Sequence, residues 1–159
     1  MKSVVFQQTG RVVAVQTQAN VLQALLAEQV PVRMACGGKG ICATCHVHVA
    51  RGRNGLTPLT KKEARTLDLI GGTSECSRLA CQAKVISDGV VIRLPEGLYV
   101  DRAADFEDLI GRRTQEPLLH PVDGRILVAV GKIMTRSALE HLRQAEADLQ
   151  VLMRNSTEV

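Results

Sequence analysis

Four of the five cysteines stand in a pattern that constrains this chain more than any other feature. Cys36, Cys42 and Cys45 are spaced C-x5-C-x2-C, and Cys81 follows 36 residues after the third. Thiolates crowded into one loop repel one another unless a cation or a cluster neutralises them. Soft sulfur ligands select zinc, copper(I) or an iron–sulfur centre. The spacing therefore predicts a loop that binds a metal centre.

The residues between the first two cysteines indicate which centre this is. Gly37, Gly38 and Gly40 lie there, and glycine lets the backbone adopt positive φ and pass close to a bound group. A sulfide-bridged cluster needs such a loop wrapped around it, with N–H groups aimed at sulfur. A structural zinc site usually has two compact cysteine pairs, whereas only Cys42 and Cys45 form one here. The pattern favours an iron–sulfur cluster, with a zinc site or unliganded thiols as alternatives.

At these residues the sequence resembles the 2Fe–2S ferredoxins of the plant and adrenodoxin type. The resemblance lies in Cys36-Gly37-Gly38-x-Gly40-x-Cys42-Ala43-Thr44-Cys45-His46 and in Ser77-Arg78-Leu79-Ala80-Cys81-Gln82. Five residues between the first two ligands, and histidine after the third, are closer to the adrenodoxin branch. The resemblance covers roughly residues 1–95. It implies a β-grasp fold and a one-electron carrier, not an enzyme, whose single 2Fe–2S cluster is held by Cys36, Cys42, Cys45 and Cys81.

Three further side chains, Cys76, His46 and His48, lie near the motif. Cys76 is left over, and we expect a free structural thiol there; a disulfide or a ligand exchange with Cys81 is the alternative. His46 could donate a hydrogen bond that links the loop to the rest of the fold, although a plain structural or surface role is an equal alternative. His48 shares its strand face, and we expect a structural or surface role for it.

The hydrophobic pattern predicts a small α+β domain around this loop. The expected strands are Lys2–Gln8, Arg11–Gln16, Cys45–Ala50, Leu79–Ile86 and Val90–Leu94, and the expected helices are Ala19–Gln29 and Thr60–Ile70. The second helix opens with Thr60 and Glu63 at the spacing of a capping box. This order predicts one mixed sheet packed on a helix. Because aromatic residues make up only 2%, Val, Leu, Ile and Ala must form the core.

Residues 1–98 are expected to form the ferredoxin domain, and residues 99–159 a linker with a C-terminal extension. The extension should contain a linker, a turn, a strand and a helix, at Val100–Asp108, Val122–Arg125, Ile126–Val130 and Ser137–Met153. Ser137 and Glu140 are at capping-box spacing. The extension is too small for a secure core of its own. It should therefore pack on the ferredoxin domain, on a second copy or on a partner. We expect a docking or homodimerisation element, with a structural cap as the alternative.

The charge distribution bears on the partners. Residues 1–100 carry 12 Lys and Arg against 6 Asp and Glu, a net charge of +6, whereas residues 101–159 carry 8 against 10, or −2. Ferredoxins of this type are typically acidic and dock on basic reductases. Basic residues prevail between the third and fourth cysteines: Arg51, Arg53, Lys61, Lys62 and Arg65 stand against Glu63, Asp68 and Glu75. We therefore expect a reductase and an acceptor with acidic docking surfaces, or else mainly apolar docking. Ordinary solvated side chains are the alternative reading of these charges.

The sequence leaves three functional hypotheses. The first is a one-electron carrier that serves a dedicated rather than a general redox partner. The second is a redox-sensing adaptor whose cluster state controls partner binding through the extension, and the third is a zinc-stabilised interaction module. Dispersed basic residues without a stacking set of aromatics argue against nucleic-acid binding. Neither a signal peptide nor a membrane span is expected, which favours a cytoplasmic protein without membrane insertion.

Overall fold

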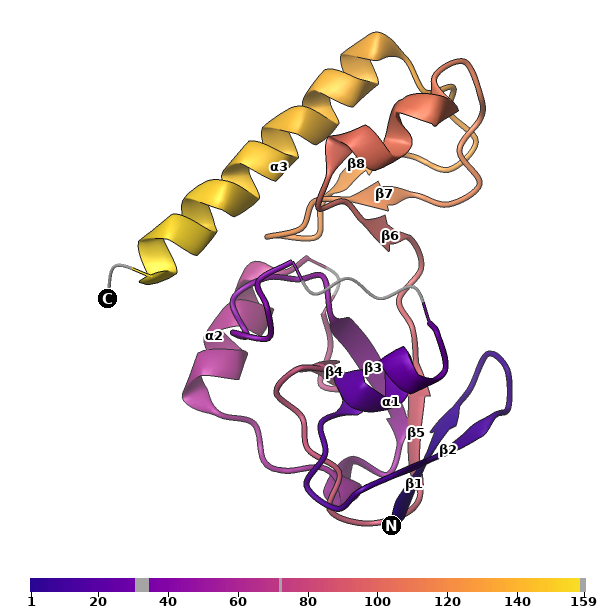
Figure 1. Cartoon of the computed structure of the whole chain (residues 1–159), viewed down its shortest axis with the longest axis vertical. Helices are drawn as coiled ribbons and strands as arrows, with labels where there is room; N and C mark the ends of the chain where they lie inside the picture. The colour runs from indigo at the N-terminus through magenta and orange to yellow at the C-terminus, as the bar shows by residue number, and fades with distance from the viewer. Residues whose placement is uncertain (31–34, 72, 158–159) are drawn as a thin grey trace.

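The computed structural model describes residues 1–30, 35–71 and 73–157, and it contains a five-stranded mixed sheet (Figure 1). The strands are β1 (Lys2–Phe6), β2 (Val12–Val15), β3 (His46–Arg51), β4 (Ser77–Leu79) and β5 (Val90–Arg93). Their order across the sheet is β2-β1-β5-β3-β4, with β1 and β5 parallel and the other neighbours antiparallel. This arrangement confirms the α+β class and the expected mixed sheet.

The first two strands form the expected hairpin. β1 and β2 pair antiparallel, with Val4 opposite Val13 and Lys2 opposite Val15. Successive side chains of a strand point to opposite faces, and Val4, Val13 and Val15 are buried on the same face of this pair. Branched apolar side chains at alternate positions therefore fix both the strand pairing and the side of the sheet that becomes the core.

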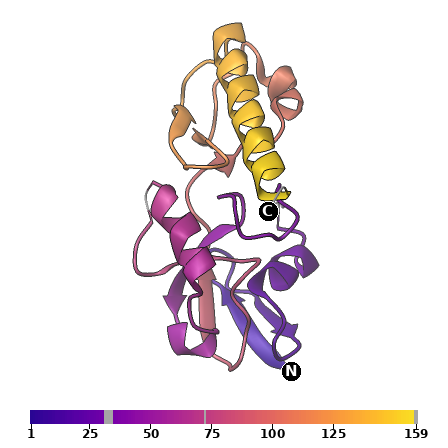
Figure 2. The same cartoon turned by 90° about the vertical axis from the view of Figure 1, so that its left-hand side faces the viewer.

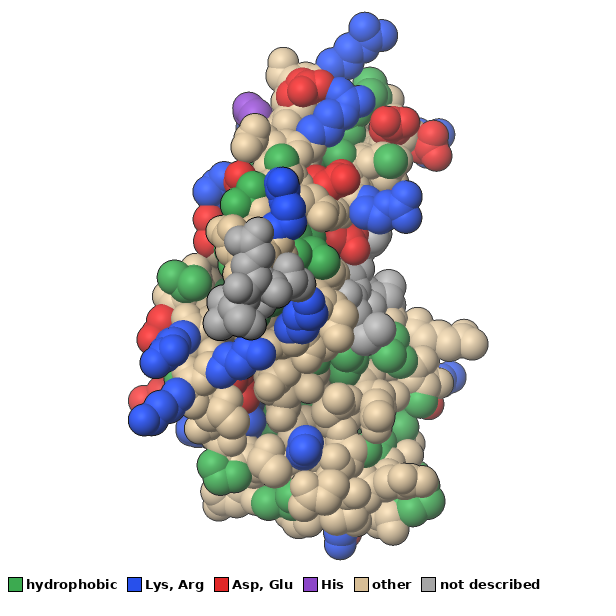
Figure 3. Space-filling view, turned by 60° about the vertical axis from the view of Figure 1, so that its left-hand side comes forward, with side chains coloured by type: hydrophobic (Ala, Val, Ile, Leu, Met, Phe, Trp, Pro, Cys, Tyr) green, Lys and Arg blue, Asp and Glu red, His purple; other side chains and the backbone are tan. Residues whose placement is uncertain are grey.

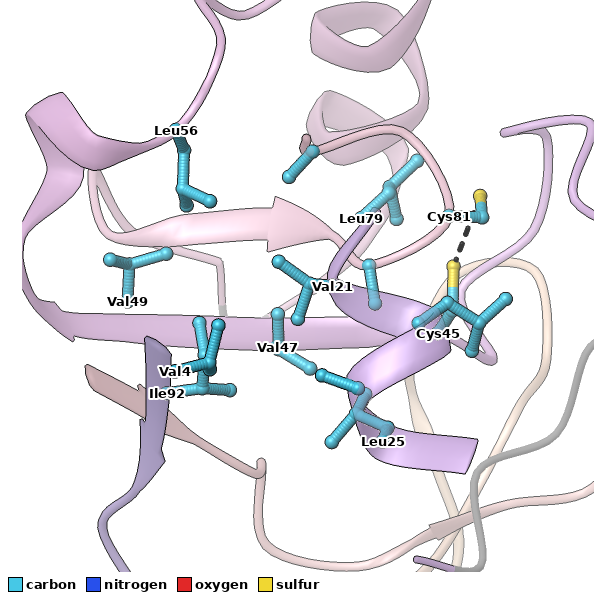
Figure 4. Close-up of a cluster of buried hydrophobic side chains, with 14 of the residues drawn as sticks. Val4, Val21, Leu25, Cys45, Val47, Val49, Leu56, Leu79, Cys81 and Ile92 are labelled. Carbon is cyan, nitrogen blue, oxygen red and sulfur yellow. Dashed lines mark hydrogen bonds between the residues drawn. The ribbon is translucent and has the colours of Figure 1, made fainter. Parts of the chain in front are cut away.

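Two helices accompany the sheet. Helix α1 (Val21–Ala27) starts at Asn20, whose side chain accepts a hydrogen bond from Gln23 N. Its apolar face lies on the sheet, where Val21 and Leu25 point toward the strand residues (Figure 4). Helix α2 (Lys61–Leu69) starts at Thr60, whose hydroxyl accepts from Glu63 N at 3.1 Å. The start expected for the second helix is confirmed.

The strand expected over Leu79–Ile86 is wrong. Strand β4 ends at Leu79, and the chain then turns through Cys81, with Ala83 N donating to the Leu79 carbonyl at 3.0 Å. The carbonyls of Ala80 and Ala83 accept from the first N–H groups of α1 instead of from a neighbouring strand. The alternating apolar residues in this segment reflect burial under α1, which periodicity alone does not distinguish from a strand.

Residues 98–157, which we call the C-terminal segment, form a second part of the molecule next to the part with the five-stranded sheet (Figure 1). Its elements are β6 (Leu98–Tyr99), the 3-10 helix η2 (Ala103–Leu109), β7 (Leu118–Leu119), β8 (Ile126–Val128) and helix α3 (Arg136–Thr157). A further 3-10 helix, η1 (Arg53–Gly55), lies outside this segment, between β3 and α2. Strands β6, β7 and β8 make a small sheet in that order. Within the described part of the chain, no helix is long and apolar enough to cross a membrane.

Two expectations for the C-terminal segment are wrong. The acidic stretch Val100–Asp108 is not a linker, because most of it forms η2 and buries Ala103 and Phe106 in a core shared with α3. Helix α3 is capped not by Ser137 but by Thr135, whose hydroxyl accepts from Ala138 N at 3.0 Å. The turn before β8 and the strand itself are confirmed.

Candidate functional site

The four motif cysteines meet at one end of the five-stranded sheet. Cys36 and Cys42 lie in the loop before β3, which we call the cluster loop (residues 35–45), and all four thiols are buried. Cys45 at the end of this loop and Cys81 after β4 bring their sulfur atoms to 3.4 Å (Figure 4). Cys36 and Cys42 contact each other in a separate small cluster of buried side chains. The structure therefore groups the cysteines as two pairs.

Within each pair, one thiol favours the ionised form. Hydrogen bonding from Cys42 lowers the pKa of Cys36 to about 4, and hydrogen bonding from Cys45 lowers the pKa of Cys81 to about 7. The same two hydrogen bonds, together with burial, raise the pKa of Cys42 and that of Cys45. In each pair, the hydrogen bond therefore favours the thiolate of one cysteine, which is the form that binds metals.

The loop glycines provide the space that a bulky group needs. Gly37, Gly38 and Gly40 have φ values of 68°, 84° and 74°, which confirms the expected positive φ. A Cβ atom on Gly40 would lie 2.8 Å from the side chain of Gln82. The Gln82 amide donates to Gly38 O at 3.0 Å and to Cys81 Sγ at 3.4 Å. Gln82 therefore ties the loop to the fourth cysteine.

His46 connects the cluster loop to two other parts of the fold. Its Nδ1 lies 2.9 Å from the hydroxyl of Tyr99 in β6, and its Nε2 lies 2.9 Å from Ser77 Oγ in β4. Burial lowers the pKa of His46 to about 4, and the neighbouring His48 adds to this effect. The neutral ring thus donates one hydrogen bond and accepts the other. The linking role expected for His46 is confirmed, but sequence reasoning missed Tyr99.

The remaining expected residues lie outside the cysteine pairs. Cys76 is half-buried beside the start of β4, and its thiol is free, as are those of the four motif cysteines. A disulfide with Cys81 is therefore not formed. His48 faces the same side of β3 as His46, and its Nδ1 is a buried polar atom without a hydrogen-bond partner among the described residues.

A buried ion pair supports the segment that carries Cys81. The Glu63 carboxylate in α2 is fully buried and accepts from the Arg78 guanidinium at 2.8 and 3.0 Å. The same carboxylate accepts from Leu79 N at 2.9 Å. Sequence reasoning assigned Glu63 to a capping box and to the exposed charges of α2, and both readings of its carboxylate are wrong. An acidic residue at an otherwise apolar helix position is the signal that could have indicated the pair.

The grouping of the sulfur atoms bears on what the site can hold. In the described part of the chain, no group of three or more His, Cys, Asp or Glu side chains is placed to hold one metal ion. Two adjacent cysteine pairs are instead the donor set of a two-iron cluster, with four thiolates in total. Gly37, Gly38 and Gly40 let the loop pass close to the cysteines with positive φ, and Gln82 supplies a hydrogen bond to sulfur. The residues present fit a 2Fe–2S cluster.

A mixed sheet that presents buried cysteine pairs under a glycine loop defines an iron–sulfur protein of the electron-transfer class. Residues 4–85 match the family model of the 2Fe–2S iron–sulfur cluster binding domain. The chain belongs to this ferredoxin family, and it carries one 2Fe–2S cluster for electron transport. The family match leaves residues 86–159 outside it.

Known proteins support the family and the fold. The chain is 40% identical over 76 residues to 2Fe–2S ferredoxin-5 of Aquifex aeolicus, which covers 47% of this chain and 79% of that protein. The crystal structure of the ISC-like 2Fe–2S ferredoxin FdxB of Pseudomonas putida matches with 31% identity and a TM-score of 0.55, over 60% of this chain and 93% of that one. Putidaredoxin in a covalent complex with putidaredoxin reductase matches with 27% identity and a TM-score of 0.50, over 59% and 98% of the two chains. The five-stranded sheet with its helices matches the β-grasp fold of these ferredoxins.

Proposed function

We propose that Cys36, Cys42, Cys45 and Cys81 hold the 2Fe–2S cluster, one pair of thiolates for each iron. The observation that carries this proposal is the convergence of two buried cysteine pairs, with 3.4 Å between the sulfur atoms of the second pair. When bound, the cluster accepts and gives up one electron. The four thiolates would give the bound cluster a net negative charge. The backbone of the cluster loop and the Gln82 amide would provide hydrogen-bond donors around it.

The protein serves as a carrier and not as an enzyme, because no bond has to form or break in this exchange. Burial of all four cysteines excludes water from the sulfur atoms. The Gln82 amide near Cys81 Sγ stabilises the more negative, reduced state. These residues set the potential and hold the loop in place, while a reductase and an acceptor supply and remove the electron.

The partners are a dedicated reductase and acceptor with acidic docking surfaces. Putidaredoxin, a structural relative, forms a complex with its reductase, which supports a protein reductase here. Lys61, Lys62 and Arg65 are exposed on α2, whereas Glu63 is buried against Arg78. Burial of that carboxylate makes the exposed side of α2 more basic than its sequence indicates, which supports an acidic partner.

Three finer expectations stay predictions. The C-x5-C spacing is the basis for placing the chain in the adrenodoxin branch. The domain boundary after residue 98 can be located by limited proteolysis of the purified protein.

A homodimer through the C-terminal segment would double the mass measured by sedimentation equilibrium, whereas a monomer at all concentrations would contradict it.

Two matched serine variants test the ligand assignment. Cys81→Ser should remove or strongly weaken the visible absorption and the circular dichroism of the cluster, because it deletes one of four thiolate ligands. Cys76→Ser should leave both spectra unchanged, since Cys76 lies beside β4 and away from the loop. The opposite pattern, with the spectrum lost in Cys76→Ser, would show that the ligand assignment is wrong.

A redox-sensing adaptor is a second candidate function, and one observation favours it. The C-terminal segment contacts the cluster loop directly, because Leu149 packs with Cys36 and Cys42. A change of one unit of charge next to this contact could alter what the segment binds, provided that the binding differs between the two states. Equal partner affinities of the oxidised and reduced full-length protein would contradict this function.

A further inference from the structure

The C-terminal segment covers one side of the cluster loop. In Figures 1 and 2, the end of α3 reaches the top of the ferredoxin part beside this loop. Leu149 is 1% exposed and forms a buried cluster with Cys36 and Cys42. The partly buried Met153, one helical turn further on, packs against the same cluster. Apolar side chains of α3 thus lie where the first two cysteines would otherwise be nearest to solvent.

The turn between β7 and β8 fastens the same contact from a second direction. Pro121 O accepts a hydrogen bond from Ala43 N in the cluster loop at 2.7 Å, and Asp123 O accepts from Gly71 N after α2 at 2.6 Å. Main-chain hydrogen bonds of this kind need both partners held in place. The C-terminal segment is therefore hydrogen-bonded to the cluster loop and to Gly71 after α2, and it does not merely lie beside them.

A buried histidine joins the turn to α3. His120 Nδ1 accepts from Val122 N at 3.1 Å, and Nε2 lies 2.9 Å from Asp148 Oδ2 on α3. The Nε2–H group donates to this carboxylate, because Nδ1 already acts as the acceptor. Turn and helix are thus linked to each other as well as to the loop, and they cover it as one unit.

One edge of the cluster loop stays open. Gly37 and Lys39 are exposed, whereas the cysteines on either side are buried. Helix α2 flanks this edge, because Thr66 Oγ1 donates to Gly40 O at 2.6 Å. Lys62 lies one turn before Thr66 on the same helix and is exposed. Figure 3 shows Lys and Arg side chains grouped on the face of the molecule that carries α2.

We propose that the C-terminal segment is a built-in cap that selects the redox partner by steric exclusion. It closes the Cys36 and Cys42 side of the loop, so that one electron passes to or from a partner across the edge at Gly37–Lys39, and no bond forms or breaks. The partner that fits this edge is a protein with an acidic surface, because Lys39 on the edge and Lys62 and Arg65 on the flanking helix α2 are exposed. A partner that would have to approach the loop from the Cys36 and Cys42 side is rejected, because it would collide with the C-terminal segment. This inference rests on the proposed cluster ligands.

Hydrogen exchange tests the cap in the full-length protein. Leu149→Ser removes the apolar contact, and amides in peptides that contain Ala43 or Gly71 should exchange at least about tenfold faster. Val151→Ser is the matched control, because Val151 is on the same helix and 48% exposed; exchange should not change. Should Leu149→Ser fail to fold, Met153→Ser takes its place. Equal exchange in the contact variant and the control would overturn the cap.

Electron transfer tests the open edge. The dithionite-reduced protein gives one electron to one ferric haem, either of the acidic cytochrome b5 or of the basic cytochrome c. Lys62→Glu should slow reduction of cytochrome b5 at low salt by at least about threefold and speed that of cytochrome c, because steering depends on charge sign. Lys132→Glu, in the C-terminal segment and exposed, should change neither rate. Equal effects of the two charge reversals would overturn the basic edge as the exchange surface.

The contact variant has its own result in the same assay. Leu149→Ser should speed transfer to both cytochromes, since it opens the closed side, whereas Val151→Ser should not. Failure of the cap and failure of the proposed function are distinguishable. A purified chain without a 2Fe–2S spectrum contradicts the ligand assignment, whereas an intact spectrum with equal rates in wild type and Leu149→Ser overturns only the cap.

Discussion

Glu63 illustrates how one buried charge organises the segment behind the site. Its carboxylate accepts from Nε and Nη2 of Arg78 and from Leu79 N, so that helix α2 holds strand β4 two residues before Cys81. A buried ion pair is weak evidence for net stabilisation, but removal of one partner leaves an uncompensated charge. The pair therefore fixes where the fourth cysteine begins its turn toward the cluster loop.

Glu63→Gln should lower the free energy of unfolding by about 3 kcal/mol, because the Arg78 guanidinium stays 12% exposed without a counter-charge. Chemical denaturation followed by far-ultraviolet circular dichroism measures this change. Asp68→Asn is the control, since Asp68 is exposed on the same helix, and it should change the free energy by less than about 0.5 kcal/mol. Similar losses in both variants would show that the buried pair has no special role.

Gln82→Ala should shift the reduction potential to a more negative value. The amide donates to Cys81 Sγ at 3.4 Å, and a donor to sulfur favours the reduced state. A loss of about 1 kcal/mol corresponds to roughly 40 mV for one electron. Spectroscopic titration measures the potential, with Gln23→Ala on the exposed face of α1 as the control. A shift toward more positive values would contradict this role of Gln82.

At the residue scale, the sequence predicts that the three loop cysteines lie close together, but not which residues contact them. The spacing of Cys36, Cys42 and Cys45 predicts one loop, because short intervals cannot separate the thiols. The contacts of Tyr99 with His46, and of Pro121 with Ala43, join positions that lie far apart in the chain. No local pattern contains such pairs, because they depend on how the C-terminal segment packs.

At the scale of elements, local signals succeeded where the partner was also local. Thr60 caps α2 as its spacing predicts, and the β1–β2 hairpin follows from alternate branched residues. The strand expected over Leu79–Ile86 failed because its carbonyls accept from the start of α1, which is a tertiary contact. The linker expected at Val100–Asp108 failed because three apolar side chains of this acidic stretch, Val100, Ala103 and Phe106, are buried in the core around η2.

The start of α3 gives a direct test of such a correction. Thr135→Ala should lower the free energy of unfolding by about 1 kcal/mol, because it removes the hydroxyl that accepts from Ala138 N. Ser137→Ala, at the position that the capping-box spacing suggested, should have little effect. Thermal or urea unfolding of both variants measures the difference. A larger loss of unfolding free energy in Ser137→Ala than in Thr135→Ala would show that Ser137 is the N-cap of α3, as its spacing suggested.

At the scale of the molecule, the cluster loop is one of the places where the two parts of the chain meet. Leu149 and Met153 pack on it from α3, and Ala43 N donates to Pro121 O. Because metal binding is generally coupled to the folding of the residues that bind the metal, we expect the C-terminal segment to respond when the metal centre is removed. The core that η2 shares with α3 does not touch the cysteines, so it should respond less.

Removal of iron by a chelator under reducing conditions should therefore loosen one contact selectively. Peptides that contain Leu149 and Val122 should lose protection from hydrogen exchange, whereas peptides from η2 and from β1 should keep most of it. Mass spectrometry of the holo and apo forms gives the comparison. Uniform loss of protection along the whole chain would indicate global unfolding instead, and no loss near Leu149 would contradict the contact.

Chemical analysis of the purified chain is the most direct test of the proposed function, because the proposed electron transfer depends on a 2Fe–2S cluster held by four cysteines. Iron, zinc and acid-labile sulfide are measured per chain after anaerobic purification, together with the electron paramagnetic resonance spectrum of the reduced protein. We expect two iron and two sulfide atoms per chain and one unpaired spin on reduction. A colourless protein that contains zinc without sulfide would contradict the proposed function.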